Sequence, residues 1–408
     1  MRKNLWFCVS LLFLTGACCA PASKEDEIIV QLKALSDEIK REHAPDRRSR
    51  TLEVTFSAEP NAQGKVYVAK GATTQSEAKA AFVSAAAAKG ITLLDSIKLL
   101  PDSALGSKVY GVIFLSVNNL RNVPEHSNEM DTQTLMGMPV QVLENRGGWF
   151  RLRTPEGYIS WVNSSVQTMT VEEANRWKKG DKIVITTHYT LFREQPSITS
   201  AVVRDGVWGN VVEAVGEQSG HYKVMLPDGK SAFVPKADAQ RFDDWLKQCN
   251  PTAANLVATA KQFMGVPYLW GGTSIKAVDC SGFIKSSFFL NGVIIPRDAS
   301  QQVQAGEEVD ITEGLALLQP ADLIFFGRKA TERSSERVTH VGMYIGDGKF
   351  IHSSSSSGCV IINSLVRGEP DYSTTAESMV RAKRFVHLID KDKEIVSIVK
   401  HPWYQQAK

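Results

Sequence analysis

The stretch that decides the fold of the second half of the chain is Asp279-Cys-Ser-Gly-Phe283, which leads into an apolar run ending at Leu290. Within this run, positions 280, 283, 284, 287 and 288 fall on one face of a helix. We therefore expect Cys280 to open a buried helix, where unpaired backbone amides and the helix dipole favour a thiolate. A nucleophilic cysteine needs this setting and a base that takes its proton.

The candidate base is His340, in the alternating segment Val338-Thr-His-Val-Gly-Met-Tyr-Ile-Gly346. The alternation predicts a strand, Gly346-Asp-Gly348 predicts a hairpin turn, and the return strand carries His352. A three-residue loop would pair position 342 with 352 and place both imidazoles on one face. A two-residue loop would pair 343 with 352 and separate the rings. Only the first register lets His352 orient His340.

Each of these residues also has a purely structural interpretation. A lone cysteine is usually a small buried hydrophobe, and a histidine on a strand is usually a core or surface group. Zinc is disfavoured because the sequence has no closely spaced pair of the His-x-x-x-His or Cys-x-x-Cys kind. We therefore expect no metal and no cofactor.

The N-terminal residues have the pattern of a secretory signal. Arg2 and Lys3 precede an apolar stretch over 5–14, which is followed by small residues and is too short to span a bilayer. The pattern predicts a signal peptide at 1–22 and an exported, periplasmic or envelope-associated protein, the alternative being a buried N-terminal helix. A lipid anchor at Cys18 or Cys19 is an alternative that the sequence leaves unproven, since neither cysteine has Leu, Val or Ile three residues upstream.

Composition narrows the class of protein. The 408 residues predict two to four domains, and 43% hydrophobic with 22% charged residues is typical of globular chains. A mean hydropathy of −0.16 excludes a polytopic membrane protein, and a net charge of +3 argues against a nucleic-acid partner. The chain beyond the signal has three cysteines, which is too few for a disulfide scaffold. The sequence leaves open whether Cys249 and Cys359 form a pair.

The chain divides by pattern into several parts. Mixed helix and strand signals predict an N-terminal α/β domain over 23–121. A weak internal repeat, in which Trp149 to Val162 resembles Tyr222 to Val234, predicts two small β-barrels at 122–178 and 179–245, against one larger β-domain. An α+β domain is expected over 246–390 and a tail over 391–408. The predicted fold class is multidomain α+β.

Six motifs along 250–388 resemble, in order and spacing, those of the NlpC-type cell-wall cysteine peptidases, which are papain-like. A polar insertion, Lys329 to Arg337, departs from the family pattern and is expected to form a surface loop or a rim of the cleft. The resemblance implies Cys280 as nucleophile, His340 as base and His352 as orienting group. The motifs are Tyr268-Leu-Trp-Gly-Gly, Asp279-Cys-Ser-Gly-Phe, Pro296-Arg-Asp-Ala-Ser-Gln-Gln302, Ala321-Asp-Leu-Ile-Phe-Phe326, His340-Val-Gly-Met-Tyr-Ile-Gly and Phe350-Ile-His-Ser353.

The whole layout, with the two repeats as tandem SH3-like domains, resembles the γ-D-glutamyl-L-diamino acid endopeptidases, also called dipeptidyl-peptidase VI. In that group the first SH3-like domain leans over the cleft and restricts it to peptides with a free N-terminal L-Ala. The resemblance implies that the substrate-binding residues are Glu129, Tyr158, Tyr268, Trp270, Asp279 and Ser281. Asp279 could instead be a helix N-cap, and Tyr158 a residue of the barrel core.

The expected activity is hydrolysis of the γ-D-Glu–diamino-acid bond in peptides derived from peptidoglycan. A general peptidoglycan endopeptidase or amidase on the same scaffold is one alternative, and a non-catalytic wall-binding protein is another. An intact Cys280, His340 and His352 argues against the binding protein. The sequence does not distinguish diaminopimelate from lysine as the diamino acid.

Overall fold

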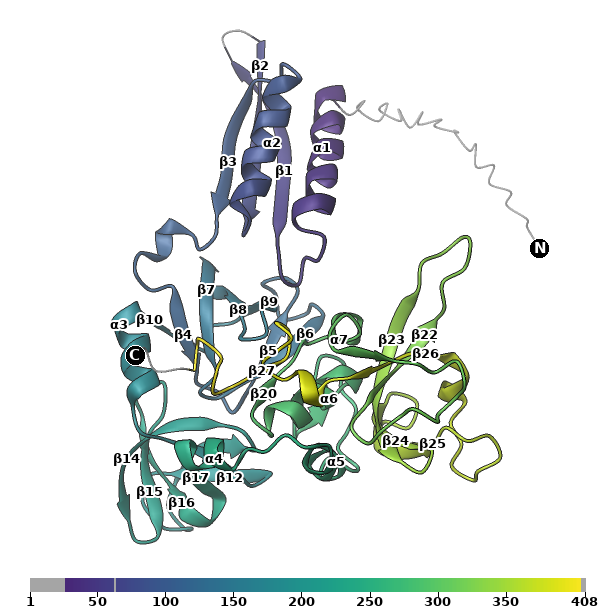
Figure 1. Cartoon of the computed structure of the whole chain (residues 1–408). Coiled ribbons are helices and arrows are strands. Elements are labelled where there is room, and N and C mark those ends of the chain that lie inside the picture. Colours follow the sequence, from purple (N-terminus) through teal and green to yellow (C-terminus); the bar gives the residue numbers. More distant parts are fainter. Residues whose placement is uncertain (1–25, 62–63, 405–408) are drawn as a thin grey trace, which may run out of the picture.

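The computed structural model describes residues 26–404 except 62 and 63. The predicted signal peptide, with Cys18 and Cys19, lies outside the described residues. Figure 1 shows a helix-covered sheet at one end, two strand-rich units, and a larger mixed part that carries the second half of the chain. Over the described ranges, no helix is long and apolar enough to cross a membrane. The chain is a multidomain, mostly β protein.

The N-terminal part is a three-stranded sheet with two helices packed against one face (Figure 1). Its elements are α1 (Glu27–His43), β1 (Leu52–Asn61), β2 (Gly64–Thr73), α2 (Ser76–Ala88) and β3 (Leu93–Leu99). β2 pairs antiparallel with β1 and parallel with β3. Leu32, Leu35 and Ile39, whose spacing predicts a helix, are the buried face of α1, and Phe82 is the fully buried contact of α2.

Two seven-stranded sheets with the same strand order follow. The first sheet has the order β10-β4-β7-β8-β9-β5-β6, and the second has the order β13-β12-β16-β15-β14-β11-β17. When β4 to β10 are matched in chain order to β11 to β17, the two orders are the same, read from opposite edges of the sheet. The first consists of β4 (Tyr110–Ile113), β5 (Val117–Arg121), β6 (Met130–Leu135), β7 (Pro139–Arg146), β8 (Trp149–Arg153), β9 (Ile159–Val162) and β10 (Val166–Met169). The second consists of β11 (Lys182–Ile185), β12 (Tyr189–Arg193), β13 (Val202–Val207), β14 (Val211–Gln218), β15 (His221–Met225), β16 (Ser231–Pro235) and β17 (Ala239–Arg241).

The sheet pairings place one boundary differently from the sequence analysis. β4 and β5 pair within the first sheet, although the sequence pattern assigned them to the N-terminal domain ending at 121. The repeat signal was readable only in the hairpins around the Gly turns, so the leading strands of the first copy were not recognised. Helix α3 (Val171–Lys179) connects the two sheets, and α4 (Phe242–Gln248) follows the second.

The last part of the chain combines a six-stranded sheet with buried helices. The sheet order is β21-β26-β22-β23-β24-β25, and α6 packs against β23 and β24 around a large apolar core. The elements are α5 (Ala253–Lys261), β18 (Thr273–Ser274), β19 (Ala277–Val278), α6 (Cys280–Phe289), β20 (Val293–Ile294), α7 (Ala299–Gln302), β21 (Glu307–Val309), β22 (Leu323–Arg328), β23 (Arg337–Gly346), β24 (Lys349–Ser354), β25 (Cys359–Ser364), β26 (Met379–Arg384) and β27 (Val396–Ser397).

The segment that the sequence pattern assigned to a tail, 391–408, is packed into the fold as far as it is described. β27 pairs with β20, and the side chains of Ile395 and Ile398 are fully buried. The three cysteines of the described chain, Cys249, Cys280 and Cys359, are free thiols, so the pair left open by the sequence is not formed.

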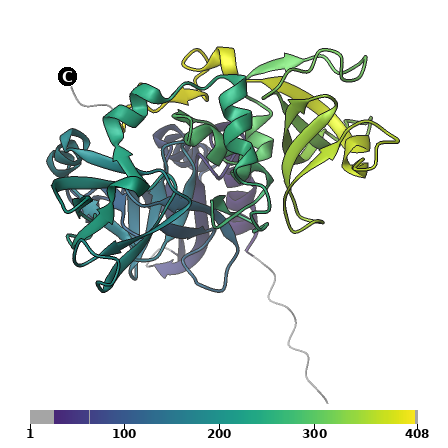
Figure 2. The same cartoon turned by 90° about the horizontal axis from the view of Figure 1, so that it is seen from below.

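The first sheet is attached directly to the last part of the chain. The Gln133 side chain accepts a hydrogen bond from the backbone amide of Thr273 at 2.9 Å, and the Gln133 carbonyl accepts one from the Thr273 hydroxyl at 3.0 Å. Glu156 of the first sheet and Lys285 of α6 form a buried ion pair at 3.2 Å. Figure 2 shows the two halves side by side. These buried polar contacts fix the first sheet over the start of α6, where Cys280 lies.

Candidate active site

Cys280 begins helix α6, as the apolar spacing predicts. The N-cap is Asp279, whose carboxylate accepts the backbone amide of Gly282 at 2.7 Å. The helix is buried on nearly all sides, so its start is held firmly in the core. Helix α6 packs against β23, and the backbone amide of Val341, the residue after His340, acts on the pKa of the Cys280 thiol in the lowering direction. The nucleophile candidate therefore lies beside the strand that carries the base candidate.

The hairpin of β23 and β24 brings the two histidines together. Its turn is formed by Asp347 and Gly348, whose φ angles of 50° and 69° are typical of a type I′ turn. A register shift between Tyr344 and Gly346 then sets Met343 opposite Ile351, and so 342 opposite 352. Position 342 therefore lies opposite 352, as the first of the two alternatives predicts. The turn itself has two residues, and the extra residue at the irregularity makes up the difference.

The histidines form a chain of hydrogen bonds with Asn363 of β25. The distance from His340 Nε2 to His352 Nδ1 is 2.7 Å, and that from His352 Nε2 to Asn363 Oδ1 is 3.0 Å. Asn363 Nδ2 donates to the Asp371 carbonyl at 3.0 Å, so its Oδ1 must accept from His352. A neutral His352 then carries its proton on Nε2 and accepts at Nδ1 from His340 Nε2–H. The lone pair of His340 is left on Nδ1.

The electrostatics keep both reacting groups neutral at rest. Burial first, and His352 second, lower the pKa of His340 to about 3. Burial first, and the Asp279 carboxylate second, raise the pKa of Cys280 to about 12. The thiolate expected from the helix start is therefore not favoured before substrate binds, because burial and the N-cap charge oppose the helix dipole.

Asp279 is fully engaged by protein partners. Besides the amide of Gly282, it accepts the amide of Gly271 at 2.9 Å. The guanidinium of Arg297, which is only 1% exposed, binds its two carboxylate oxygens at 2.7 and 3.2 Å. Arg297 also donates to the Thr132 hydroxyl of the first sheet at 2.7 Å. The carboxylate is thus an N-cap and the anchor of a buried ion pair, with little capacity left for a ligand.

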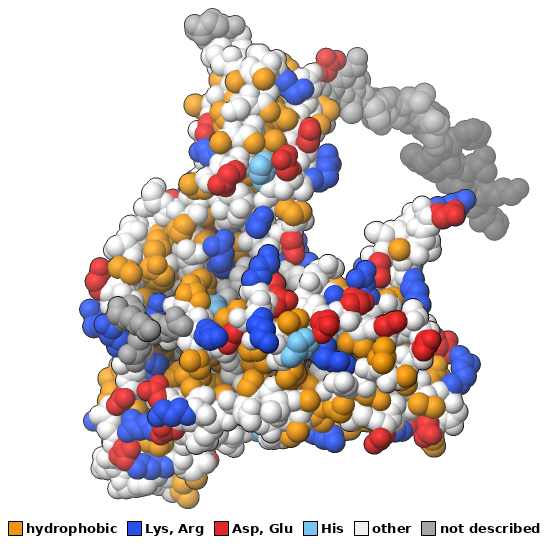
Figure 3. Space-filling model, viewed as in Figure 1, with side chains coloured by type: hydrophobic (Ala, Val, Ile, Leu, Met, Phe, Trp, Pro, Cys, Tyr) orange, Lys and Arg blue, Asp and Glu red, His pale blue; other side chains and the backbone are white. Residues whose placement is uncertain are grey.

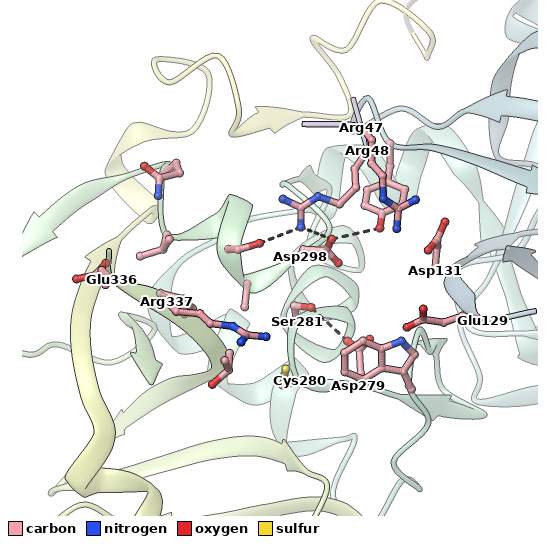
Figure 4. A pocket seen from close by; sticks show the side chains of 18 of the residues that line it. Arg47, Arg48, Glu129, Asp131, Asp279, Cys280, Ser281, Asp298, Glu336 and Arg337 are labelled. Carbon is pink, nitrogen blue, oxygen red and sulfur yellow. Dashed lines mark hydrogen bonds and ion pairs between the residues drawn. The ribbon is translucent and has the colours of Figure 1, made fainter. Parts of the chain in front are cut away.

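A cavity of about 770 Å³ opens at the Cys280 sulfur. Figure 4 shows Glu129 and Asp131 on one side of Cys280 and Arg337 on the other. Neither histidine is among the residues that line the cavity, but His340 directly follows Thr339, which is, and His352 is hydrogen-bonded to His340. Seven predicted site residues line its wall, namely Cys280, Glu129, Tyr158, Tyr268, Trp270, Asp279 and Ser281.

The acidic wall of the cavity, defined here as Glu129, Asp131 and Tyr158, belongs to the first sheet. The Glu129 carboxylate is exposed and has no hydrogen-bond or ion-pair partner within the described part of the chain. Burial raises the pKa of Asp131, which accepts the Ser160 hydroxyl. Tyr158 is buried except at its hydroxyl, which donates to Asp298 at 3.2 Å, so the oxygen can still accept a hydrogen bond.

Tyr268 and Trp270 enclose the cavity near the sulfur. Burial first, and the neighbouring Cys280 second, raise the pKa of Tyr268 to about 12, so its hydroxyl stays protonated and can donate. Trp270 is 61% exposed, which leaves one ring face for a ligand. Ser281 donates to Asp279 and accepts from Arg297, so its side chain is part of the buried network.

Several residues of the site escaped the sequence reasoning. Arg48, between α1 and β1, binds Asp298 at 2.7 Å and Ser300 at 2.9 Å, so the N-terminal domain reaches the cavity. Asp131 lies two positions after Glu129, at the start of β6, and this closeness in sequence could have revealed it. Arg297 stands in the motif that begins at Pro296, but nothing in the motif showed its pairing with Asp279, and Asn363 carried no signal of its own.

This arrangement suits acyl transfer by a thiol with an imidazole base. A chain of neutral hydrogen bonds orients the base, and a protonated hydroxyl and the amides at the start of α6 are available to a developing oxyanion. The matching family models agree with this chemistry. The NlpC/P60 family matches residues 265–379, and the bacterial dipeptidyl-peptidase SH3 domain matches residues 120–165.

Similar proteins cover most of the chain. A γ-D-glutamyl-L-lysine dipeptidyl-peptidase of Bacillus cereus is 33% identical over 56% of this chain and 68% of its own length. A protein of the same name from Bacillus subtilis is 30% identical over 58% and 77%. A crystal structure of an NlpC/P60 family protein from Bacillus cereus superimposes with a TM-score of 0.57 at 27% identity, covering 68% of this chain and 99% of that one. The chain belongs to the NlpC/P60 family and is a cysteine peptidase.

Proposed function

We propose that this protein hydrolyses the γ-D-Glu–L-diamino acid bond of peptidoglycan stem peptides that have a free N-terminal L-Ala. The observation that carries the proposal is the acidic wall facing Cys280 across one cavity. A free α-amine is a cation at neutral pH, and enclosing it is costly unless carboxylates receive it. The names of the relatives from Bacillus support the same bond, and the matched SH3 domain supports the same placement of the wall.

In the proposed reaction, His340 Nδ1 takes the Cys280 proton as the sulfur attacks the γ-carbonyl of D-Glu. Because both groups are neutral at rest, the transfer occurs when substrate arrives. The Tyr268 hydroxyl and the amides at the start of α6 would hold the oxyanion. The imidazolium of His340, oriented by His352 and Asn363, then protonates the leaving amine. Water, deprotonated by the same imidazole, releases the acyl-enzyme.

We assign the α-amine of L-Ala to Glu129 and Asp131, with the Tyr158 oxygen as a third acceptor. Asp279, for which the resemblance implies the same role, is neutralised by Arg297, so we assign it to positioning the start of α6. Trp270 would cover the peptide. The second sheet shares the strand order of the first, and we infer that both are SH3-like barrels. The N-terminal residues and the wall-hydrolase relatives support an exported, envelope-associated protein.

The test is hydrolysis of L-Ala-γ-D-Glu-meso-diaminopimelate and its N-acetyl form, followed by mass spectrometry. We expect release of the dipeptide from the free peptide. We expect the acetylated one to lose about 30-fold in kcat/KM, equivalent to roughly 2 kcal/mol. Cys280→Ala should abolish turnover, whereas the matched control Cys249→Ala, which removes a half-buried free thiol that does not line the cavity, should retain it.

Each alternative outcome selects a different function. Equal cleavage of free and acetylated peptides would make the protein a general wall endopeptidase or amidase and refute the role of the acidic wall. Peptide binding without turnover by the wild-type chain would make it a wall-binding protein. Turnover by Cys280→Ala would refute the mechanism.

A further inference from the structure

The cavity rim opposite the acidic wall is built by the insertion that departs from the family pattern. The insertion, Lys329 to Arg337, forms the end of the β22–β23 hairpin, with Thr331 and Ser334 bridged at its tip. Figure 1 shows this hairpin extending away from the sheet, and Figure 3 shows its charged tip standing free of the N-terminal domain across an open notch. The base of the hairpin, positions 336–339, lines the cavity.

Arg337 is a cation without a protein partner at this rim. Its side chain is exposed and forms no hydrogen bond or ion pair with any residue in the ranges 26–61 and 64–404. The adjacent acid, Glu336, is already bound to Arg381 at 2.8 Å. Directly across the hairpin, Arg337 faces Arg328, which also has no partner in those ranges. Like charges on opposite strand positions are unfavourable, so the pair does not serve stability.

Arg337 lies on the side of Cys280 where a leaving group must sit. In Figure 4, Glu129 and Asp131 lie on one side of the sulfur and Arg337 on the other. Arg337 is on β23, the strand that also carries His340, the proposed donor of a proton to the leaving amine. A peptide held by its N-terminus at the acidic wall, with its carbonyl at Cys280, therefore extends its leaving residue toward Arg337.

We infer that Arg337 binds a carboxylate on the side chain of the leaving residue, and that the enzyme therefore prefers diaminopimelate to lysine. The inference rests on the proposed function and names the diamino acid that function leaves open. Diaminopimelate ends in a carbon that bears a carboxylate and an amine, whereas lysine ends in an ammonium group alone. A guanidinium binds the carboxylate by paired N–H···O bonds, and the end of diaminopimelate is neutral overall, whereas the end of lysine has one positive charge that the guanidinium repels.

The experiment compares kcat/KM for two tripeptides, L-Ala-γ-D-Glu-meso-diaminopimelate and L-Ala-γ-D-Glu-L-lysine, with the full chain. Both have the same C-terminal carboxylate, so they differ only in the side chain. We expect the wild type to prefer the diaminopimelate peptide by about tenfold. R337Q should reduce this preference to about twofold or less, and R337K should keep part of it. Amidating the side-chain carboxylate of diaminopimelate should mimic R337Q.

R328Q is the matched control, because Arg328 is the cross-strand neighbour of Arg337 but does not line the cavity. It should leave both rates and their ratio unchanged. Equal wild-type rates on the two peptides, a preference for lysine, or an equal loss on both peptides in R337Q would overturn the inference while leaving the proposed function standing. If neither tripeptide is cut, the proposed function fails and the inference falls with it.

Discussion

The two seven-stranded sheets are alike in backbone and different in what they offer a ligand. β5 and β12 begin at Val117 and Tyr189, and β6 and β13 at Met130 and Val202, so these strands of the second sheet follow their counterparts 72 residues later. At the positions of Glu129, Asp131 and Tyr158, the second sheet has Ala201, Val203 and Lys230. The same fold carries the acidic wall in one copy only.

Both sheets nevertheless use one equivalent position to contact the catalytic half. Gln133 of the first sheet binds Thr273, and its counterpart Asp205 binds Lys276 at 2.6 Å, only three residues further along the chain. Docking is therefore shared by the copies, and the acidic side chains are not. The shared fold therefore presents an equivalent surface in both sheets, while a few side chains decide whether that surface can bind a ligand.

The strongest test gives the first sheet the residues of the second. The double variant Glu129→Ala, Asp131→Val should lower kcat/KM for the free-amine tripeptide by about 100-fold, because the buried α-amine loses both carboxylates. Turnover of the N-acetyl peptide should change little. Alkylation of Cys280 by iodoacetamide, followed by peptide mass spectrometry, should proceed at the wild-type rate. An equal loss on both peptides would mean that the wall supports structure only.

The next test separates binding by the first sheet from chemistry by the histidines. His352→Asn should reduce kcat by about tenfold, less than the loss in His340→Ala, since orienting a base matters less than being one. His352 lowers the pKa of His340, so its removal should raise that pKa and shift the acid limb of the kcat–pH profile to higher pH. An acid limb that stays in place would contradict the hydrogen-bonded pair.

The smallest effect is expected when two of the wall residues are placed at the equivalent positions of the second sheet. Ala201→Glu, Lys230→Tyr introduces wall residues at exposed positions outside the cavity. Rates on free and acetylated peptides should stay within about twofold of wild type, as for surface substitutions in general. A marked gain or loss for either peptide would show that the second sheet also contacts substrate.

Local patterns were enough to predict the elements on which Cys280 and His340 lie. Cys280 lies at the junction of a turn and an apolar run with helical spacing, and His340 lies in an alternating strand, so each is marked by its neighbours. The sequence offered two registers for the hairpin, and one of them pairs position 342 with 352. The irregularity before Gly346 that reconciles a two-residue turn with that register was not, because it depends on how the whole hairpin packs on α6.

Contacts between distant segments were beyond the sequence reasoning. The ion pair of Asp279 with Arg297 depends on packing within the last part of the chain. The engagement of Arg48 with Asp298 depends on how the N-terminal domain docks on it. Asp279 illustrates the difference, since its place before Cys280 fits both a helix cap and a ligand. Only the buried guanidinium in the structure decides for the first.

The link from Arg48 to Asp298 and on to Tyr158 connects the N-terminal domain to the amine site that we propose, and it does not include Cys280 or the histidines. The carbonyl of Arg48 also accepts the amide of Ile159, next to Tyr158. Local unfolding of the N-terminal domain on heating would therefore loosen the tyrosine before it disturbs the thiol and its histidines. A gently heated sample would become a less selective enzyme before it became an inactive one.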